Sequence, residues 1–136
     1  MIKLKSLLLE ADLPKKFYHL TRYDNLKSIR SKGLKPFGPK PWIYLTDDEF
    51  TAVNYANAYD KGTRVILLEI YSQYLDKSKL GPDDDDLKMV LRQQNKEFDW
   101  YDVPWEESLR MVSQITYKGT IPSEAIRVKQ SWIVSI

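Results

Sequence analysis

The run from residue 64 to residue 71, Arg-Val-Ile-Leu-Leu-Glu-Ile-Tyr, constrains the fold most, because its centre is apolar without interruption. Short apolar runs bounded by polar residues are typical of buried strands. Consecutive side chains of a strand point to opposite faces, so this run predicts a strand that is covered on both faces. Further strands are predicted at 17–21, 42–46, 114–119, 126–128 and 132–136, and helices at 23–32, from Thr46 or Asp47 to about Tyr59, at 87–94 and at 105–112.

The length of 136 residues favours a single domain, in which 15–136 form the main unit and 1–12 a short N-terminal helical segment. No apolar run approaches the ~18 residues that a membrane span requires, and the apolar stretch near the start lacks the pattern of a secretory signal. We therefore expect a soluble, cytoplasmic protein with no membrane partner. Without cysteine and with a single histidine, thiolate and multi-histidine metal sites are excluded, so no metal is expected.

Two strand-to-helix corners carry the most informative polar side chains. The first predicted strand ends with His19 and Thr21, and His19 is the only histidine of the chain. The strand at 42–46 places Tyr44 and Thr46 in the same way, and a helix follows each strand. Ligands commonly bind at the ends of adjacent strands, so the two corners predict the two walls of one pocket.

Positive charge is concentrated in the first third of the chain, although the formal net charge is only +2. Residues 15–40 contain eight lysines and arginines against one acid, Asp24. This excess suits a ligand that carries phosphate, either a dinucleotide or a nucleic acid, and solvated lysines on an exposed helix face are the alternative. The candidate phosphate-binding residues are Arg22, Arg30, Lys35 and Lys40.

Two other segments admit more than one interpretation. The acidic run from Asp83 to Asp86 either binds a hard cation or supplies negative charge to a helix N-terminus, and the second interpretation is simpler because calcium-loop spacing is missing. A turn is predicted just before it, at Gly81-Pro82. The aromatic residues Trp100, Tyr101 and Trp105 either stack on nucleic-acid bases or close the core and form a partner surface.

In their order, these motifs resemble the ADP-ribosyltransferase-like fold, which mono-ADP-ribosyltransferases, poly-ADP-ribose polymerases and NAD-dependent RNA 2′-phosphotransferases share. The matching features are Tyr18-His19-Leu20-Thr21, the helix ending Lys32-Gly33-Leu34, Ile43-Tyr44-Leu45-Thr46, Tyr55-Ala56, the strand at 65–70, and the segment 113–126. The resemblance implies an α+β fold, a split and mostly antiparallel β sandwich with flanking helices. It also implies a cleft between the strand of His19 and the strand of Tyr44.

The resemblance further implies roles for individual residues toward NAD as a co-substrate. His19 would hydrogen-bond the adenosine-side ribose, and the backbone at Leu20 would bind the nicotinamide amide. Many relatives have glycine at the position of Leu20, and the larger leucine side chain narrows the space for the nicotinamide group. Tyr44 would pack against the nicotinamide ring, since aromatic stacking adds on the order of 1 kcal/mol to burial. The residues assigned to NAD binding are His19, Leu20, Thr21, Arg22, Tyr44, Thr46 and Tyr55.

Gln114 occupies the position where transferases of this fold place a glutamate that stabilises an oxocarbenium-like transition state. Glutamine keeps a hydrogen-bond acceptor but has no charge, and losing one electrostatic stabiliser commonly costs a rate factor of ~100. Glu69 or the pair Glu106-Glu107 would replace that carboxylate only if folding brings it to the pocket, which is the less favoured arrangement. The residues assigned to catalysis are His19, Tyr44 and Gln114, with Gln114 orienting the ribose or the acceptor.

The expected function is NAD-dependent transfer of ADP-ribose to a protein, nucleic acid or small molecule. An RNA 2′-phosphotransferase is the nearest alternative, and it requires several of the basic candidates to converge on the pocket. The glutamine also admits a non-catalytic module that binds NAD, ADP-ribose or a nucleic-acid end, so an enzyme is favoured but not required. A plain interaction protein is the remaining class. The opening residues weakly resemble those of tailed-bacteriophage proteins, which would be compatible with a bacterial or phage-infected cell.

Overall fold

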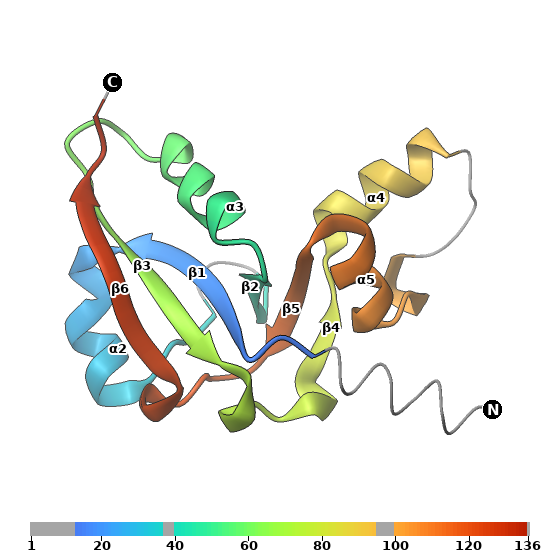
Figure 1. The fold of residues 1–136 in the computed structure, drawn as a ribbon, viewed down its shortest axis with the longest axis horizontal. Helices are drawn as coiled ribbons and strands as arrows, with labels where there is room; N and C mark the ends of the chain where they lie inside the picture. The colour runs from blue at the N-terminus through green and yellow to red at the C-terminus, as the bar shows by residue number, and fades with distance from the viewer. Residues whose placement is uncertain (1–12, 37–39, 95–99, 136) are drawn as a thin grey trace.

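The computed structural model of the chain describes residues 13–36, 40–94 and 100–135, and it is an α+β domain (Figure 1). Six strands form one antiparallel sheet in the order β4-β5-β2-β1-β3-β6. The strands are β1 Lys16–Arg22, β2 Trp42–Thr46, β3 Arg64–Tyr71, β4 Leu80–Pro82, β5 Gln114–Lys118 and β6 Ile126–Ile133. The α-helices are α2 Leu26–Lys32, α3 Glu49–Asn54, α4 Asp84–Gln93 and α5 Trp105–Val112. The segment 1–12, predicted to be helical, lies outside the described residues.

Strand β3 is covered on both faces, as its sequence predicted. All six residues from Val65 to Ile70 are buried. Ile66, Leu68 and Ile70 belong to a core cluster that includes α2, whereas Val65 and Leu67 pack in a second cluster with Ala52 and Ala56 on the α3 side. The alternation follows from the two-residue period of a strand.

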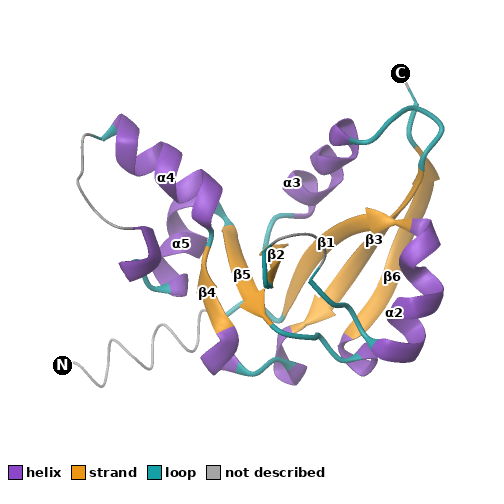
Figure 2. Ribbon diagram, turned by 180° about the vertical axis from the view of Figure 1, so that it is seen from behind, coloured by secondary structure: helices purple, strands orange, loops and turns teal. Residues whose placement is uncertain are grey.

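The sheet almost divides between β1 and β2, which confirms the split antiparallel arrangement. Strands β1 and β3 are paired over seven residues, but β1 and β2 are paired only at Tyr18 and Thr46. Helix α3 covers the half made of β1, β3 and β6, while α4 and α5 lie against the half made of β4 and β5 (Figures 1 and 2). The two halves therefore diverge from the point where β1 and β2 meet.

The structure corrects several predicted boundaries. Helix α3 is capped by Asp48, whose side chain accepts a hydrogen bond from the Phe50 backbone N–H, and not by Thr46 or Asp47. The predicted strands at 126–128 and 132–136 are replaced by the single strand β6, because a register shift opposite Leu67 and Leu68 lets it continue past Lys129. The strand ends at Ile133, and residue 136 lies outside the described residues. The predicted turn at Gly81-Pro82 is part of β4, an edge strand in which proline is tolerated.

Helix α4 begins at Asp84, three residues earlier than predicted, because Asp83 caps it. The Asp83 side chain accepts a hydrogen bond from the Asp86 backbone N–H at 2.8 Å. The acidic run thus supplies charge to a helix N-terminus, in agreement with the simpler of its two interpretations. Within the described ranges, no helix has the length and apolarity that crossing a bilayer requires.

Candidate functional site

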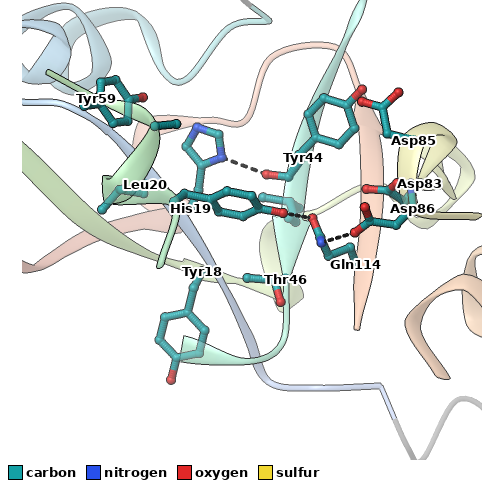
Figure 3. Close-up of a pocket in the computed structure, with 13 residues that line it drawn as sticks. Tyr18, His19, Leu20, Tyr44, Thr46, Tyr59, Asp83, Asp85, Asp86 and Gln114 are labelled. Carbon is teal, nitrogen blue, oxygen red and sulfur yellow. Dashed lines mark hydrogen bonds between the residues drawn. The ribbon is translucent and has the colours of Figure 1, made fainter. Parts of the chain in front are cut away.

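A pocket of about 420 Å³ opens where the sheet splits. Its walls come from the centre of β1, the end of β2, the start of β5, the 3-10 helix Tyr55–Ala58 and the start of α4. Figure 3 shows the acidic side chains on one side of this pocket and His19 and Tyr59 on the other. The lining residues are Tyr18, His19, Leu20, Tyr44, Leu45, Thr46, Tyr55, Ala58, Tyr59, Asp83, Asp85, Asp86 and Gln114.

His19 connects the two strands just beyond their single point of pairing. Its Nδ1 donates a hydrogen bond to the backbone carbonyl of Tyr44 at 2.7 Å. Burial lowers the pKa of His19 and the bond to Tyr44 only partly opposes that shift, so the imidazole is neutral near pH 7. A neutral ring that donates through Nδ1 keeps Nε2 as an acceptor, which suits a ligand hydroxyl.

The Tyr44 hydroxyl links β2 to the first residue of α4. It donates to Asp84 Oδ1 at 2.5 Å and accepts from Lys40 Nζ at 2.8 Å, while Lys40 also bonds Asp84 Oδ2. Burial raises the pKa of Tyr44, and the bond to Asp84 raises it further. Burial works against ionisation of Asp84, but the bonds from Lys40 and Tyr44 outweigh it and lower the Asp84 pKa. Tyr44 is therefore a fixed phenol whose ring lines the pocket wall.

Gln114, the first residue of β5, is held at both ends of its amide. Tyr55 donates its hydroxyl hydrogen to Gln114 Oε1. Gln114 Nε2 donates to Asp86 Oδ2 at 2.5 Å (Figure 3). Burial raises the pKa of Tyr55 to about 12, which keeps the hydroxyl protonated as a donor. Three residues that lie far apart in the sequence thus meet in one hydrogen-bonded row.

A second cavity of about 530 Å³ shares His19, Leu20, Tyr44, Tyr59 and Asp85 with the first pocket. It is lined by three of the four basic candidates, Arg22, Lys35 and Lys40, and the fourth, Arg30, lies elsewhere, at cavities beside α2. The two cavities together offer an aromatic and acidic compartment next to a basic one.

The remaining predicted site residues are placed as follows. Thr46 lines the first pocket, but its hydroxyl donates to the Ser113 carbonyl at 2.6 Å and accepts from the Asp48 N–H, so it serves the scaffold. Thr21 lines the second cavity and accepts a hydrogen bond from Asn25. Leu20 is buried and lines both cavities.

The acids at the start of α4 are among the pocket residues that were not assigned to the site from the sequence. Asp83, Asp85 and Asp86 line it, whereas Glu69, considered earlier as a displaced carboxylate, pairs with Lys16 at 2.5 Å. The acidic run was the only sequence feature that pointed to these residues. It predicted the start of a helix, but it did not predict that this start lies beside the pocket. Within the described part of the chain, no three histidine or acidic side chains gather to ligate a metal.

Asp83 makes stability depend on pH. Burial raises its pKa from 3.8 to about 6, so its ionised form costs stability above pH 6 and nothing below about pH 4. Asparagine keeps the capping oxygen without the charge. We expect Asp83→Asn to raise the free energy of unfolding by roughly 1–3 kcal/mol at pH 8, with a gain that vanishes toward pH 4. Urea denaturation between pH 4 and 8 measures this, with exposed Asp60→Asn as the control, and an equal gain at all pH values would contradict it.

These observations define an α+β domain whose antiparallel sheet splits at a pocket large enough for part of a nucleotide. No known protein family and no curated protein matches the sequence. Among solved structures, the fold is similar to that of EcPltA, with a TM-score of 0.54 over 90% of this chain and 86% of that chain. The two sequences are 14% identical, so the similarity establishes a common fold and no more.

Proposed function

We propose that the protein binds NAD and transfers its ADP-ribose unit to an acceptor. The observation that carries this proposal is the meeting of His19, Tyr44, Tyr55 and Gln114 around one pocket, in the order that the ADP-ribosyltransferase-like motifs imply. The similarity to EcPltA supports the fold on which the motifs depend.

The shape and charge of the two cavities suit the parts of NAD. The first pocket has the aromatic side chains of Tyr44 and Tyr55 for a planar nicotinamide ring. The basic second cavity suits the pyrophosphate, through Arg22 and Lys35 in particular. His19 lies on the wall common to both, where Nε2 can accept a bond from a ribose hydroxyl.

The sheet also leaves backbone groups for the nicotinamide amide. Beyond Tyr18, β1 has no ladder partner on its β2 side among the described residues, and this stretch begins with His19 and Leu20. Unpaired strand edges readily bond to a further partner. The edge at Leu20 is therefore a suitable place for an amide group.

A second candidate function is the NAD-dependent removal of a 2′-phosphate from RNA. Arg22, Lys35 and Lys40 converge on the second cavity, as this function requires. In such an enzyme the RNA phosphate attacks NAD, so it has no need of the glutamate that Gln114 replaces. Lys40, however, is already paired with Asp84 and Asp85. Arg22 and Lys35 would therefore be the main phosphate ligands of such an enzyme.

Replacing His19 tests NAD binding directly. Asparagine places an N–H where Nδ1 lies and can keep the bond to the Tyr44 carbonyl, but it removes Nε2. We expect His19→Asn and His19→Ala to weaken NAD binding by about 10-fold or more, since hydrogen bonds to a bound ligand are each worth about 1.5 kcal/mol. Calorimetric titration of each variant with NAD measures this. Wild-type affinity in His19→Asn would show that His19 serves the scaffold alone.

Nicotinamide release by the same samples distinguishes the candidate functions. Release that rises when protein or nucleic acid is added supports ADP-ribosyl transfer. Release that rises only with 2′-phosphorylated RNA supports the phosphotransferase. NAD binding without release under any condition indicates a binding module, and a folded wild type that binds no NAD would overturn the proposal.

A further inference from the structure

We propose that Asp86 supplies the carboxylate that Gln114 lacks, and that Gln114 is a positioning residue for it. The inference rests on the proposed function and concerns the charge that develops on the nicotinamide-side ribose. In relatives a single glutamate would both occupy position 114 and carry the negative charge. Here Gln114 of β5 occupies the position, and Asp86 of α4 carries the charge.

The hydrogen bonds of Gln114 fix the direction of its amide. A carboxylate only accepts hydrogen bonds, so the contact with Asp86 Oδ2 at 2.5 Å identifies the Gln114 atom there as Nε2. Tyr55, whose hydroxyl is a donor, bonds Oε1. The donors of the row Tyr55–Gln114–Asp86 therefore all point in one direction, toward the Asp86 carboxylate. Consecutive hydrogen bonds arranged in this way strengthen one another.

A buried serine holds Asp86 and Gln114 in place relative to one another. Ser108 of α5 is fully buried, and its hydroxyl donates to the Gln114 backbone carbonyl at 2.6 Å. The same hydroxyl accepts from the Asp83 backbone N–H at 2.9 Å, and Asp83 in turn caps the backbone N–H of Asp86. The buried Ser108 hydroxyl and the Asp83 carboxylate thus join the backbone at the start of α4 to the backbone at the start of β5.

The environment of Asp86 favours a nearby positive charge. Burial raises the pKa of Asp86, and the charges of Asp85 and Asp84 raise it further. A carboxylate whose ionised form is destabilised in this way is stabilised when a positive charge forms beside it. Lys40 neutralises Asp84 and Asp85 instead, at 2.5 and 3.3 Å, which leaves Asp86 as the pocket acid that Gln114 orients.

In the reaction, the bond between ribose C1′ and the nicotinamide nitrogen breaks, and its electron pair leaves with nicotinamide, which becomes neutral. The positive charge passes to the ribose, where the Asp86 carboxylate stabilises it electrostatically. The acceptor then forms the new bond to C1′ with its own electron pair and releases its proton to water. Asp86 remains ionised and forms no covalent bond.

The test compares Asp86→Asn with the double variant Asp86→Asn/Gln114→Glu, with NAD as the ligand. We expect Asp86→Asn to bind NAD within about threefold of the wild type and to release nicotinamide about 100-fold more slowly. The double variant returns a carboxylate to the pocket from β5, and we expect it to recover at least about 10-fold of the lost rate. Exposed Asp60→Asn is the matched control and keeps the wild-type rate.

The outcomes separate this inference from the proposed function. A wild-type rate in Asp86→Asn overturns the role of Asp86 and leaves the transfer function standing. A slow Asp86→Asn whose rate Gln114→Glu does not restore shows that the lost rate does not depend on a negative charge in the pocket, and it also overturns the inference. A wild type that binds NAD but never releases nicotinamide overturns the transfer function, and this inference with it.

Discussion

Replacing Gly33 with alanine is expected to lower the free energy of unfolding by about 3 kcal/mol or more. Gly33 ends helix α2 with φ of +83°, in the region that favours glycine. A Cβ there would lie 2.4 Å from the backbone oxygen of Ile121. That oxygen accepts the Leu34 N–H at 2.9 Å, and both Leu34 and Ile121 are fully buried. Relief of the clash must therefore move backbone that the core holds in place.

Gly62 offers a matched control for this prediction. It has nearly the same backbone angle, φ of +87°, but a Cβ there would meet nothing within 4 Å. Gly62→Ala is expected to cost only the conformational strain, about 1 kcal/mol. Urea denaturation of both variants gives the difference that belongs to the close approach at Ile121. Equal losses at the two glycines would contradict the argument.

Shortening either of two adjacent residues of β3 is expected to cost about 2–5 kcal/mol each. Leu67 and Leu68 are both fully buried, but they face opposite sides of the sheet and belong to different core clusters. Leu→Ala at either position leaves a cavity that rigid neighbours fill only in part. Equilibrium unfolding of Leu67→Ala and Leu68→Ala measures both losses.

The control for these two variants is Ile133→Ala in the neighbouring strand. Ile133 is 61% exposed, so its truncation is expected to change stability by less than about 1 kcal/mol. If only one of the two leucine variants were strongly destabilised, β3 would be covered on a single face. That result would also contradict the described position of Tyr55 in the site, because α3, which directly precedes Tyr55, packs on the same face of the sheet as Leu67.

The elements that local chemistry dictates could be predicted from the sequence. The apolar run of β3 predicted its burial on both faces, and helix α5 begins and ends at the predicted residues, Trp105 and Val112. The acidic run predicted a helix start, although the cap moved that start from Leu87 to Asp84. Strand β4 was missed because pairing with β5, and not the propensity of Gly81 and Pro82, makes it a strand.

The candidate site, too, was predicted from the sequence only in part. The pattern of two strand-to-helix corners predicted that His19 and Tyr44 lie together, and the structure joins them through one hydrogen bond. The contact follows from the antiparallel pairing of β1 with β2, which places His19 one residue past the Tyr18–Thr46 pair and within reach of the Tyr44 carbonyl. The assignment of NAD to this place stays a prediction.

The sequence by itself determined the buried strand and the glycine-ended helix, because each depends on periodicity or on backbone preference within a few residues. Only the tertiary structure decided which of the pocket carboxylates binds the Gln114 amide. Gln114 and Asp86 lie 28 residues apart, and four consecutive acids at a helix start are locally equivalent. The Asp83 cap is local, but the lysine that pairs with Asp84 and the amide that pairs with Asp86 are set by where α4 lies relative to β2 and β5.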